Sequence, residues 1–197
     1  MRNVIFDIGG VVLDWNPDRI LSGYYAEAAE RAAMKQHIFL HDDWLALDQG
    51  ALSESELLAR IAQRAGRAVP ELVNLFTVVH ESLVPKPETV ALLKSLAARA
   101  VPLYCLSNMP SKAYAYLRER YDFWGLFTGI VISGEVRLVK PQREIFEYLL
   151  ARHGLTAART VFIDDSAANV HAAQAVGLQT VHFQDARQCE EALRRLL

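Results

Sequence analysis

Carboxylates follow two of the apolar segments in this 197-residue chain. Asp7 comes directly after Val4–Phe6, and the pair Asp164-Asp165 comes directly after Val161–Ile163. Three carboxylates that a fold brings together repel one another, and a hard divalent cation with oxygen ligands removes that conflict. Magnesium is the usual cation of this kind beside phosphate. These residue types therefore predict a Mg²⁺ site, provided that the fold places the three carboxylates at one edge of a β-sheet.

Other polar residues in comparable positions suit phosphate chemistry. Lys140 can neutralise a phosphoryl group during its transfer and can hold Asp7, while the Ser107 hydroxyl can donate to a phosphate oxygen. Backbone N–H groups around Gly9 and Gly10 can do the same, because glycine lets the backbone approach a ligand closely. Phosphoryl transfer depends mainly on positioning and charge stabilisation, so this set predicts phosphoryl chemistry.

Five short apolar runs predict the strands that position these residues, since most are rich in Val, Ile, Phe or Tyr and carry few charges. The runs are Val4–Phe6, Leu103–Leu106, Ile130–Ile132, Val161–Ile163 and Thr180–Phe183. The expected helices between and after them are Glu88–Arg99, Ser111–Tyr121, Gln142–His153, Ala167–Val176 and Arg187–Leu197. This alternation predicts an α/β fold, with a three-layer Rossmann-like core around a parallel five-stranded sheet. Ligands bind such sheets at the carboxyl ends of the strands, where the polar residues fall.

The long segment between the first two strands predicts a small all-helical cap. A simple crossover needs far fewer residues than this segment holds. Its expected helices are Asp18–Phe39, which we expect to be broken, Ser53–Ala65, which opens with a Ser53/Glu56 capping box, and Pro70–Leu83. We therefore predict a cap over residues 16–83 and a core over 1–15 and 84–197, with Pro85-Lys86-Pro87 as the return linker.

Composition narrows the function classes. The chain is 52% hydrophobic and 22% charged, with a formal net charge of -2. This lack of a basic surplus argues against nucleic-acid binding, and no stretch predicts a membrane span. Cys105 and Cys189 stand in unrelated contexts without a CxxC pair, so neither a disulfide framework nor a zinc site is expected. We predict a cytoplasmic protein with a small-molecule partner, as a monomer or weak homodimer.

Four motifs resemble those of the haloacid dehalogenase superfamily. They are Phe6-Asp7-Ile8-Gly9-Gly10-Val11-Val12, then Leu106-Ser107-Asn108, then Lys140-Pro141, and finally Phe162-Ile163-Asp164-Asp165-Ser166 with Asn169. Their order and spacing match, the helical insertion lies where the first-type cap of subfamily IA lies, and the resemblance covers essentially the whole chain. The sequence, including cap segment 48–56, is similar to a bacterial branch of sugar-phosphate phosphatases that includes an α-glucose-1-phosphatase.

This resemblance implies roles for the motif residues. Asp7 would be the nucleophile, and its second oxygen would bind Mg²⁺ together with the backbone carbonyl of Gly9. Asp165 would be a direct metal ligand, and Asp164 a ligand either directly or through water. The phosphate-binding residues would be Ser107, Asn108 and Lys140. The implied reaction is hydrolysis of a small phosphomonoester, such as a sugar phosphate, through an aspartyl-phosphate.

One position departs from the family pattern. Most phosphatases of the superfamily have an Asp two residues after the nucleophile, which protonates the leaving oxygen and later activates water, but here Gly9 stands there. A good general acid contributes about 10²–10⁴-fold. Either another group does this work, or the leaving group is easy, or the activity is weak. Candidate substitutes are Asp14, His41 and Asp43.

Two other functions stay open on the same residues. A 2-haloacid dehalogenase would also use Asp7 as nucleophile and would suit Ser107-Asn108, but it needs no metal, whereas the pair Asp164-Asp165 favours a metal site. A catalytically weakened relative that binds a phosphorylated ligand or a protein partner is the second alternative, because Gly9 removes the usual acid.

The three tryptophans have a simpler interpretation. Trp15, Trp44 and Trp124 are expected to pack in the core or the cap, because large aromatic side chains bury well. For Trp15 and Trp44 a place in the wall of a substrate pocket is the alternative.

Overall fold

The computed structural model describes residues 2–197 and contains a five-stranded, fully parallel sheet. The strands are β1 (Asn3–Phe6), β2 (Leu103–Ser107), β3 (Gly129–Ile132), β4 (Thr160–Asp164) and β5 (Gln179–His182). Their order across the sheet is β3-β2-β1-β4-β5, so β1 lies in the centre between β2 and β4. The five predicted strands and the parallel sheet are confirmed, with shifts of one residue or so at the ends.

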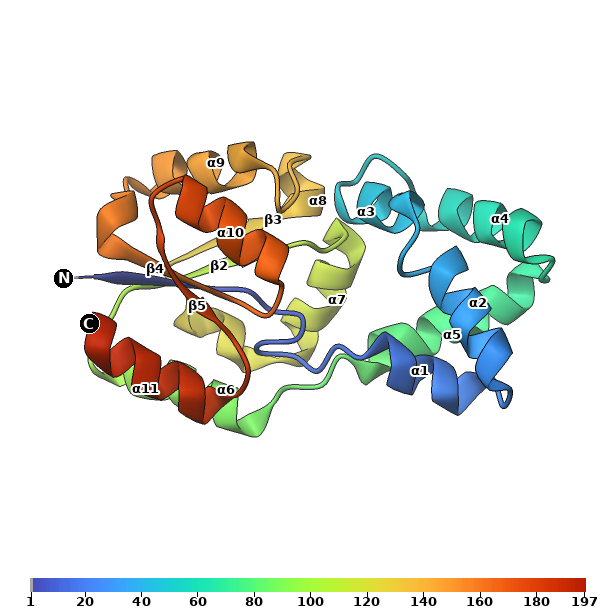
Figure 1. Ribbon diagram of the computed structural model, residues 1–197, viewed down its shortest axis with the longest axis horizontal. Helices are drawn as coiled ribbons and strands as arrows, with labels where there is room; N and C mark the ends of the chain where they lie inside the picture. The colour runs from blue at the N-terminus through green and yellow to red at the C-terminus, as the bar shows by residue number, and fades with distance from the viewer. Residues whose placement is uncertain (1) are drawn as a thin grey trace.

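Helices cover both faces of the sheet and complete three layers (Figure 1). They are α6 (Pro87–Ala98), α7 (Ser111–Arg120), α8 (Ser133–Val136), α9 (Arg143–His153), α10 (Ala167–Ala175) and α11 (Ala186–Leu196), with short 3₁₀ turns at Asp122–Leu126 and Ala157–Arg159. Side chains alternate between the faces as the pleat requires. Val4 and Phe6 pack with α6, α7 and α11, whereas Ile5 packs with α9 and α10. The predicted α/β architecture is therefore confirmed.

The segment between β1 and α6 is helical and has its own apolar core. Its helices are α1 (Pro17–Tyr24), α2 (Ala28–His37), α3 (Asp42–Asp48), α4 (Glu54–Ala65) and α5 (Val69–Ser82). The expected first helix is indeed broken, between Tyr24 and Ala28, and the capping box of Ser53 and Glu56 is present at α4. The short helix α3 was not anticipated. A separate cluster of buried side chains, from Ile20 to Val79, holds these helices together.

Two adjacent segments join this helical part to the rest of the chain. Leu13 and Pro85 form an antiparallel bridge, and the N–H groups of Asp14 and Lys86 donate to the carbonyls of Val84 and Val12, both at 2.8 Å. The outgoing and returning segments therefore run side by side between the two lobes (Figure 1). We propose residues 16–83 as the extent of the cap, as the sequence predicts.

Two further features concern the sulfur atoms and the helix lengths. Cys105 and Cys189 are both free and buried, and burial raises the pKa of each thiol, as expected for inert cysteines. Within residues 2–197 no helix is both long and apolar enough to cross a bilayer.

Candidate active site

Three carboxylates meet at the carboxyl edge of the sheet because their strands are neighbours. Asp7 follows β1, Asp164 ends β4, and the backbone N–H of Asp7 donates to the carbonyl of Ile163 at 2.9 Å. Asp7, Asp164 and Asp165 each offer an oxygen, and these oxygens all lie within 4.8 Å of one another. The convergence predicted from the carboxyl ends of parallel strands is therefore present in the structure.

Lys140 is buried among these carboxylates. Its Nζ lies 2.9 Å from Oδ1 of Asp7 and 2.7 Å from Oδ2 of Asp164. Asn108 holds the backbone of Lys140 on both sides. The Asn108 Nδ2 donates to the Lys140 carbonyl, and the Asn108 Oδ1 accepts from the Lys140 N–H, both at 2.9 Å. Asn108 therefore positions the lysine, and a direct contact of this amide with phosphate stays a prediction.

Burial and crowding set the charge state of the site. Burial raises the pKa of Asp7 to about 8, with Asp164 and Asp165 adding to the effect and Lys140 opposing it. Burial and the charge of Asp164 likewise raise the pKa of Asp165. Burial alone would lower the pKa of Lys140, but its two carboxylate partners outweigh this and raise it. The protein by itself thus carries more carboxylates here than one ammonium group can balance.

The two neighbouring aspartates differ in their surroundings. Asp164 is fully buried and accepts from the Ser166 N–H at 2.8 Å and from the amide of Asn169 at 3.0 and 3.1 Å. Asp165 instead lines a cavity between the sheet edge and the helical part. Because a Cβ on Gly10 would come within 2.0 Å of the Asp165 carboxylate, and because Gly10 has a φ of 76°, only glycine leaves room for it.

Two of the predicted phosphate-binding residues have partners or positions of another kind, and phosphate binding by Gly10 stays a prediction. The Gly10 N–H donates to the Leu13 carbonyl at 2.9 Å inside the turn, and the missing Cβ of Gly10 leaves room for Asp165. Ser107 is buried at the end of β2, and it is not among the residues that line the cavity described next. Gly9 and Asn108 do line that cavity. A phosphate contact by Ser107 stays a prediction.

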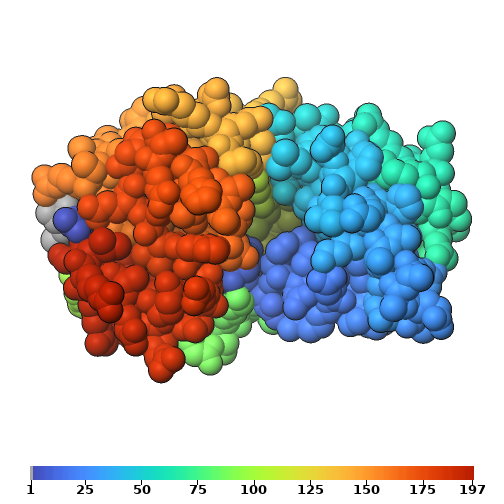
Figure 2. Space-filling view, viewed as in Figure 1, coloured from blue at the N-terminus to red at the C-terminus, as the bar shows by residue number. Residues whose placement is uncertain are grey.

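A cavity of about 410 Å³ lies between the sheet edge and the helical part. In the space-filling view the blue-to-teal lobe meets the orange and red lobe along a seam, with yellow-green atoms visible at depth (Figure 2). Asp7, Lys140 and Asp165 form the charged end of the cavity. Its other walls are mainly apolar, with Asp48, Glu54, His80 and Lys112 as titratable exceptions. The apolar residues are Trp15, Trp44, Leu47, Leu52, Phe76, Val79, Leu83 and Met109. The location matches the rule that ligands bind at the carboxyl ends of parallel strands.

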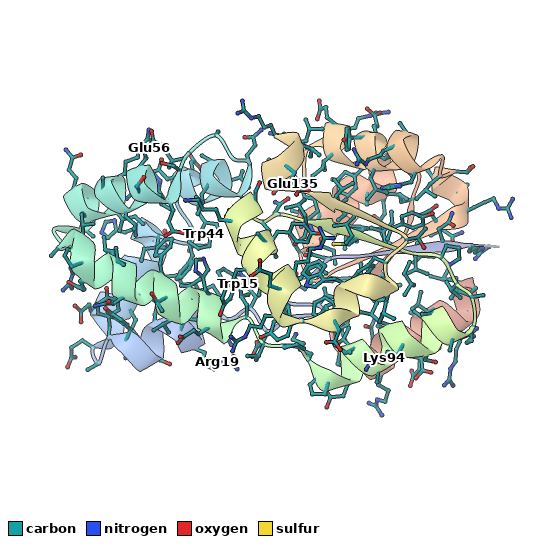
Figure 3. The ribbon with its side chains drawn as sticks, turned by 180° about the vertical axis from the view of Figure 1, so that it is seen from behind. Trp15, Arg19, Trp44, Glu56, Lys94 and Glu135 are labelled. Atoms are coloured by element: carbon teal, nitrogen blue, oxygen red, sulfur yellow. The ribbon has the colours of Figure 1, made fainter. Side chains whose placement is uncertain are left out.

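The tryptophans divide between wall and core. Trp15 and Trp44 stack with ring centroids 5.7 Å apart, and both lie on the side of the helical part that faces the core (Figure 3). Trp15 packs against the apolar clusters of both lobes. Trp124 is buried and stacks on Phe123 in the core. The alternative interpretation of Trp15 and Trp44 as pocket residues is thus confirmed.

The three proposed substitutes for the missing acid have other partners. Asp14 forms an ion pair with Arg19, and Asp43 pairs with Arg60 and Arg64 at 2.9 and 2.8 Å. His41 accepts from the Asp43 N–H at the start of α3. None of the three lines the cavity, so the geometry favours none of these candidates as the substitute acid.

Sequence reasoning assigned no role to four titratable residues of the cavity wall, Asp48, Glu54, His80 and Lys112. Asp48 is the last residue of α3 and is buried. A carboxylate in the last turn of a helix is disfavoured by the helix dipole, so its presence there is a signal for another role. That signal depends on recognising α3, a helix of 7 residues.

The site and fold agree with the comparison to known proteins. The pattern of the haloacid dehalogenase-like hydrolases matches residues 1–177, and the chain belongs to this family. The sesquiterpene phosphatase astK of Aspergillus oryzae is 30% identical over 198 residues, covering 100% of this chain and 96% of the relative. A phosphoglycolate phosphatase of Yersinia pseudotuberculosis is 26% identical, covering 90% of this chain and 78% of the relative.

Solved structures share the fold. A haloacid dehalogenase family enzyme from Bacteroides thetaiotaomicron, crystallised as a magnesium complex, superposes with a TM-score of 0.75 and 20% identity over 98% of each chain. The family match and the phosphatase relatives make the chain a hydrolase of the phosphatase type, whose relatives act on small phosphorylated substrates.

Proposed function

We propose that the chain is a Mg²⁺-dependent phosphatase that hydrolyses a phosphomonoester through an aspartyl-phosphate on Asp7. The single observation that carries this proposal is the meeting of Asp7, Asp164 and Asp165 around one point, beside the buried ammonium of Lys140. This arrangement combines a nucleophile, a set of hard oxygen donors and a fixed positive charge, which are the components that phosphoryl transfer needs.

The residues present fit a magnesium ion. Their donors are carboxylate oxygens, and burial together with the neighbouring carboxylates raises the pKa values of Asp7 and Asp165, a cost that a bound cation would relieve. We propose Asp7, the Gly9 carbonyl, Asp164 and Asp165 as the groups that hold the ion, Asp164 directly or through water. When bound, Mg²⁺ would shield the anionic nucleophile from the anionic phosphate.

The remaining steps belong to the protein. One carboxylate oxygen of Asp7 attacks phosphorus, and the bond from phosphorus to the organic oxygen breaks. Lys140 holds Asp7 and balances the charge on the phosphoryl oxygens during this step. Water then attacks phosphorus in the aspartyl-phosphate, which releases inorganic phosphate and restores Asp7. The leaving oxygen needs a proton, which Gly9 has no side chain to supply.

The cavity wall favours a substrate whose organic part is apolar. Aromatic and aliphatic side chains dominate the wall opposite the charged end, with Trp44 and Phe76 in ring contact at 5.7 Å. Apolar walls favour ligands that remove apolar surface from water. The sesquiterpene phosphatase of Aspergillus oryzae supports the same choice. We therefore propose an isoprenyl or similar apolar monophosphate, with a sugar phosphate as the alternative that the sequence favours.

A matched substrate panel tests this proposal. Purified protein with Mg²⁺ is assayed for inorganic phosphate released from geranyl and farnesyl monophosphate, glucose 1-phosphate, ribitol 5-phosphate and phosphoglycolate. We expect turnover that EDTA suppresses, with the highest kcat/KM for the isoprenyl esters. Highest kcat/KM for a sugar phosphate would keep the phosphatase and reject the apolar substrate.

The same protein is offered 2-chloropropionate, because a dehalogenase would use the same nucleophile. Phosphate release from none of the esters would contradict the proposed function. Chloride release that EDTA leaves unchanged would favour the metal-independent dehalogenase instead.

A further inference from the structure

Gly9 leaves the charged end of the cavity without a proton donor for the leaving oxygen. Four other titratable side chains line the cavity outside this charged end. They are Asp48 of α3, Glu54 of α4, His80 of α5 and Lys112 of α7. Among these four, Asp48 is buried, with 8% of its surface exposed. The other three are half-buried or exposed. A proton donor works best away from bulk water, which singles out Asp48 for closer inspection.

We propose that Asp48 of α3 is the general acid and base of this hydrolase, in place of the side chain that Gly9 lacks. This inference rests on the proposed function. Asp48 lines the same cavity as Asp7 but comes from the opposite lobe, which also supplies most of the apolar wall that the organic group would contact. The charged end would thus supply the nucleophile, and the helical part would supply the proton.

The backbone of Asp48 is fixed to the core. Its carbonyl accepts a hydrogen bond from the Ser133 hydroxyl at 2.5 Å, and the same oxygen of Ser133 accepts from the Met109 N–H at 2.8 Å. Ser133 is fully buried and begins α8, beside which α3 lies (Figure 1). Because Met109 directly follows Asn108, one hydroxyl links the position of Asp48 to the loop that holds Lys140.

The residues after Asp48 strengthen this attachment. The amide of Gln49 donates to the Arg137 carbonyl at 3.0 Å. Gly50 has a φ of 73°, and a Cβ there would lie 2.9 Å from the Gly134 carbonyl, so the close approach needs glycine. Three consecutive residues of the helical part thus contact the turn after β3. These contacts hold the backbone that carries the Asp48 carboxylate at a defined place beside the site, which favours proton transfer.

The charge balance around Asp48 also suits a proton donor. Burial raises the pKa of Asp48 to about 7, with Lys140 opposing the shift. Lys140 is already paired with Asp7 and Asp164, so it does not fix Asp48 in its ionised form. The other charged or titratable groups of the cavity wall are Glu54, His80, Lys112 and Asp165. An acid with a pKa near the working pH donates and accepts protons effectively.

The reaction then balances without a further reactant. As Asp7 attacks phosphorus, the bond to the organic oxygen breaks, and that oxygen takes the proton of the Asp48 carboxylic acid. The Asp48 carboxylate next removes a proton from water, whose oxygen attacks phosphorus and breaks the bond to Asp7. Inorganic phosphate leaves, and Asp48 is again protonated. The net reaction consumes one water and yields an alcohol and inorganic phosphate.

The leaving group distinguishes this role from a structural one. Asp48→Asn keeps the shape of the side chain but cannot donate the proton, so turnover should fall with an alkyl ester, whose leaving alcohol is weakly acidic. With p-nitrophenyl phosphate, whose leaving group needs no proton, the first turnover should barely slow, although later turnovers slow because hydrolysis of the aspartyl-phosphate needs Asp48 as base. In single-turnover measurements we expect release of the alcohol from farnesyl monophosphate to slow by about 10²-fold or more and release of p-nitrophenol by less than about threefold.

Matched variants make the outcome decisive. Asp14→Asn, in an ion pair outside the cavity, should leave both activities unchanged, and Asp7→Asn should abolish both. Equal slowing of single-turnover release from both esters in Asp48→Asn, or no slowing with either, would overturn the inference while leaving the phosphatase intact. A single-turnover loss confined to alkyl esters in His80→Gln instead of Asp48→Asn would transfer the role to His80. If the unsubstituted protein hydrolyses no ester, the proposed function itself fails, and this inference fails with it.

Discussion

The sheet edge and the helical part face one cavity with opposite chemistry. The edge contributes Asp7, Lys140 and Asp165, whose charges are held by strand ends and by buried partners. The helical part contributes an apolar wall, including Trp44, and one buried carboxylate at Asp48. Groups that act on phosphate thus come from the rigid sheet, and groups that face the organic part of the substrate come from an inserted segment. One phosphoryl-transfer site can therefore serve different alcohols as the insert changes.

The strongest way to break this comparison is to remove the nucleophile at the sheet edge. Asp7→Asn should lower phosphate release by about 10⁴-fold or more with every substrate, because the covalent route is lost whatever the organic group. The measurement is kcat for an alkyl and an aryl ester beside the Asp14→Asn control. Residual turnover within tenfold of the unsubstituted protein would show that Asp7 does not form the intermediate.

The second prediction moves the proton donor from the helical part to the sheet edge. Gly9 has a backbone conformation that other residues adopt, and an added Cβ would meet Trp15 no closer than 3.8 Å. Adding Gly9→Asp to the Asp48→Asn variant should therefore raise its turnover of farnesyl monophosphate by roughly 10- to 100-fold. The reason is that the new side chain returns an acid beside the leaving oxygen. The control is Gly9→Asn in the same background. Equal recovery in both variants would mean that the added side chain acts by packing.

These two predictions differ in how far the sequence alone supports them. Asp7, Asp164 and Asp165 were placed together from apolar runs and parallel connectivity, because a parallel sheet brings successive strand ends to one edge. The buried position of Lys140 among them follows from the same rule. The geometry of this edge was therefore largely predictable, although the occupied N–H of Gly10 and the buried Ser107 were not.

The helical part was predictable only in outline. Its existence followed from the length of the segment, and Ser53 with Glu56 marked one helix start. Asp48, however, gains its burial from a contact with Ser133, which lies 85 residues further along the chain. A helix as short as α3 carries too few turns for a periodic pattern. The roles of the aromatic wall and of Asp48 thus depend on tertiary contacts that local sequence patterns do not encode.

The third prediction concerns the stability cost of Asp48. Its pKa in the folded protein is about 7, above the ordinary value of 3.8, so the unfolded chain ionises first as pH rises. The stability contributed by the protonated form is complete below about pH 4 and is lost as pH rises through 7. Asp48→Asn should match the unsubstituted protein at pH 4 and exceed its unfolding free energy by on the order of 4 kcal/mol at pH 8.

Urea denaturation of both proteins from pH 4 to pH 8 measures this difference. Asp42→Asn serves as the control, because Asp42 lies at the exposed start of the same helix. A difference that stays constant with pH would show that Asp48 does not titrate in this range. If the unsubstituted protein instead becomes more stable than Asp48→Asn at high pH, the ionised Asp48 carboxylate is paired with a positive group.

The smallest expected effect concerns the apolar wall of the cavity. Trp44 packs against Trp15, Phe39 and Phe76, and it lines the cavity away from the charged end. Trp44→Leu removes part of this wall, so kcat/KM for farnesyl monophosphate should fall by about three- to tenfold, close to the worth of a methylene group or two. The value for p-nitrophenyl phosphate should change less, since its organic part covers less of the wall. Because both esters share Asp7 and Lys140, the ratio of the two constants isolates the wall from the chemistry. A ratio unchanged by the substitution would mean that the organic group lies elsewhere, and the polar edge alone would then account for binding.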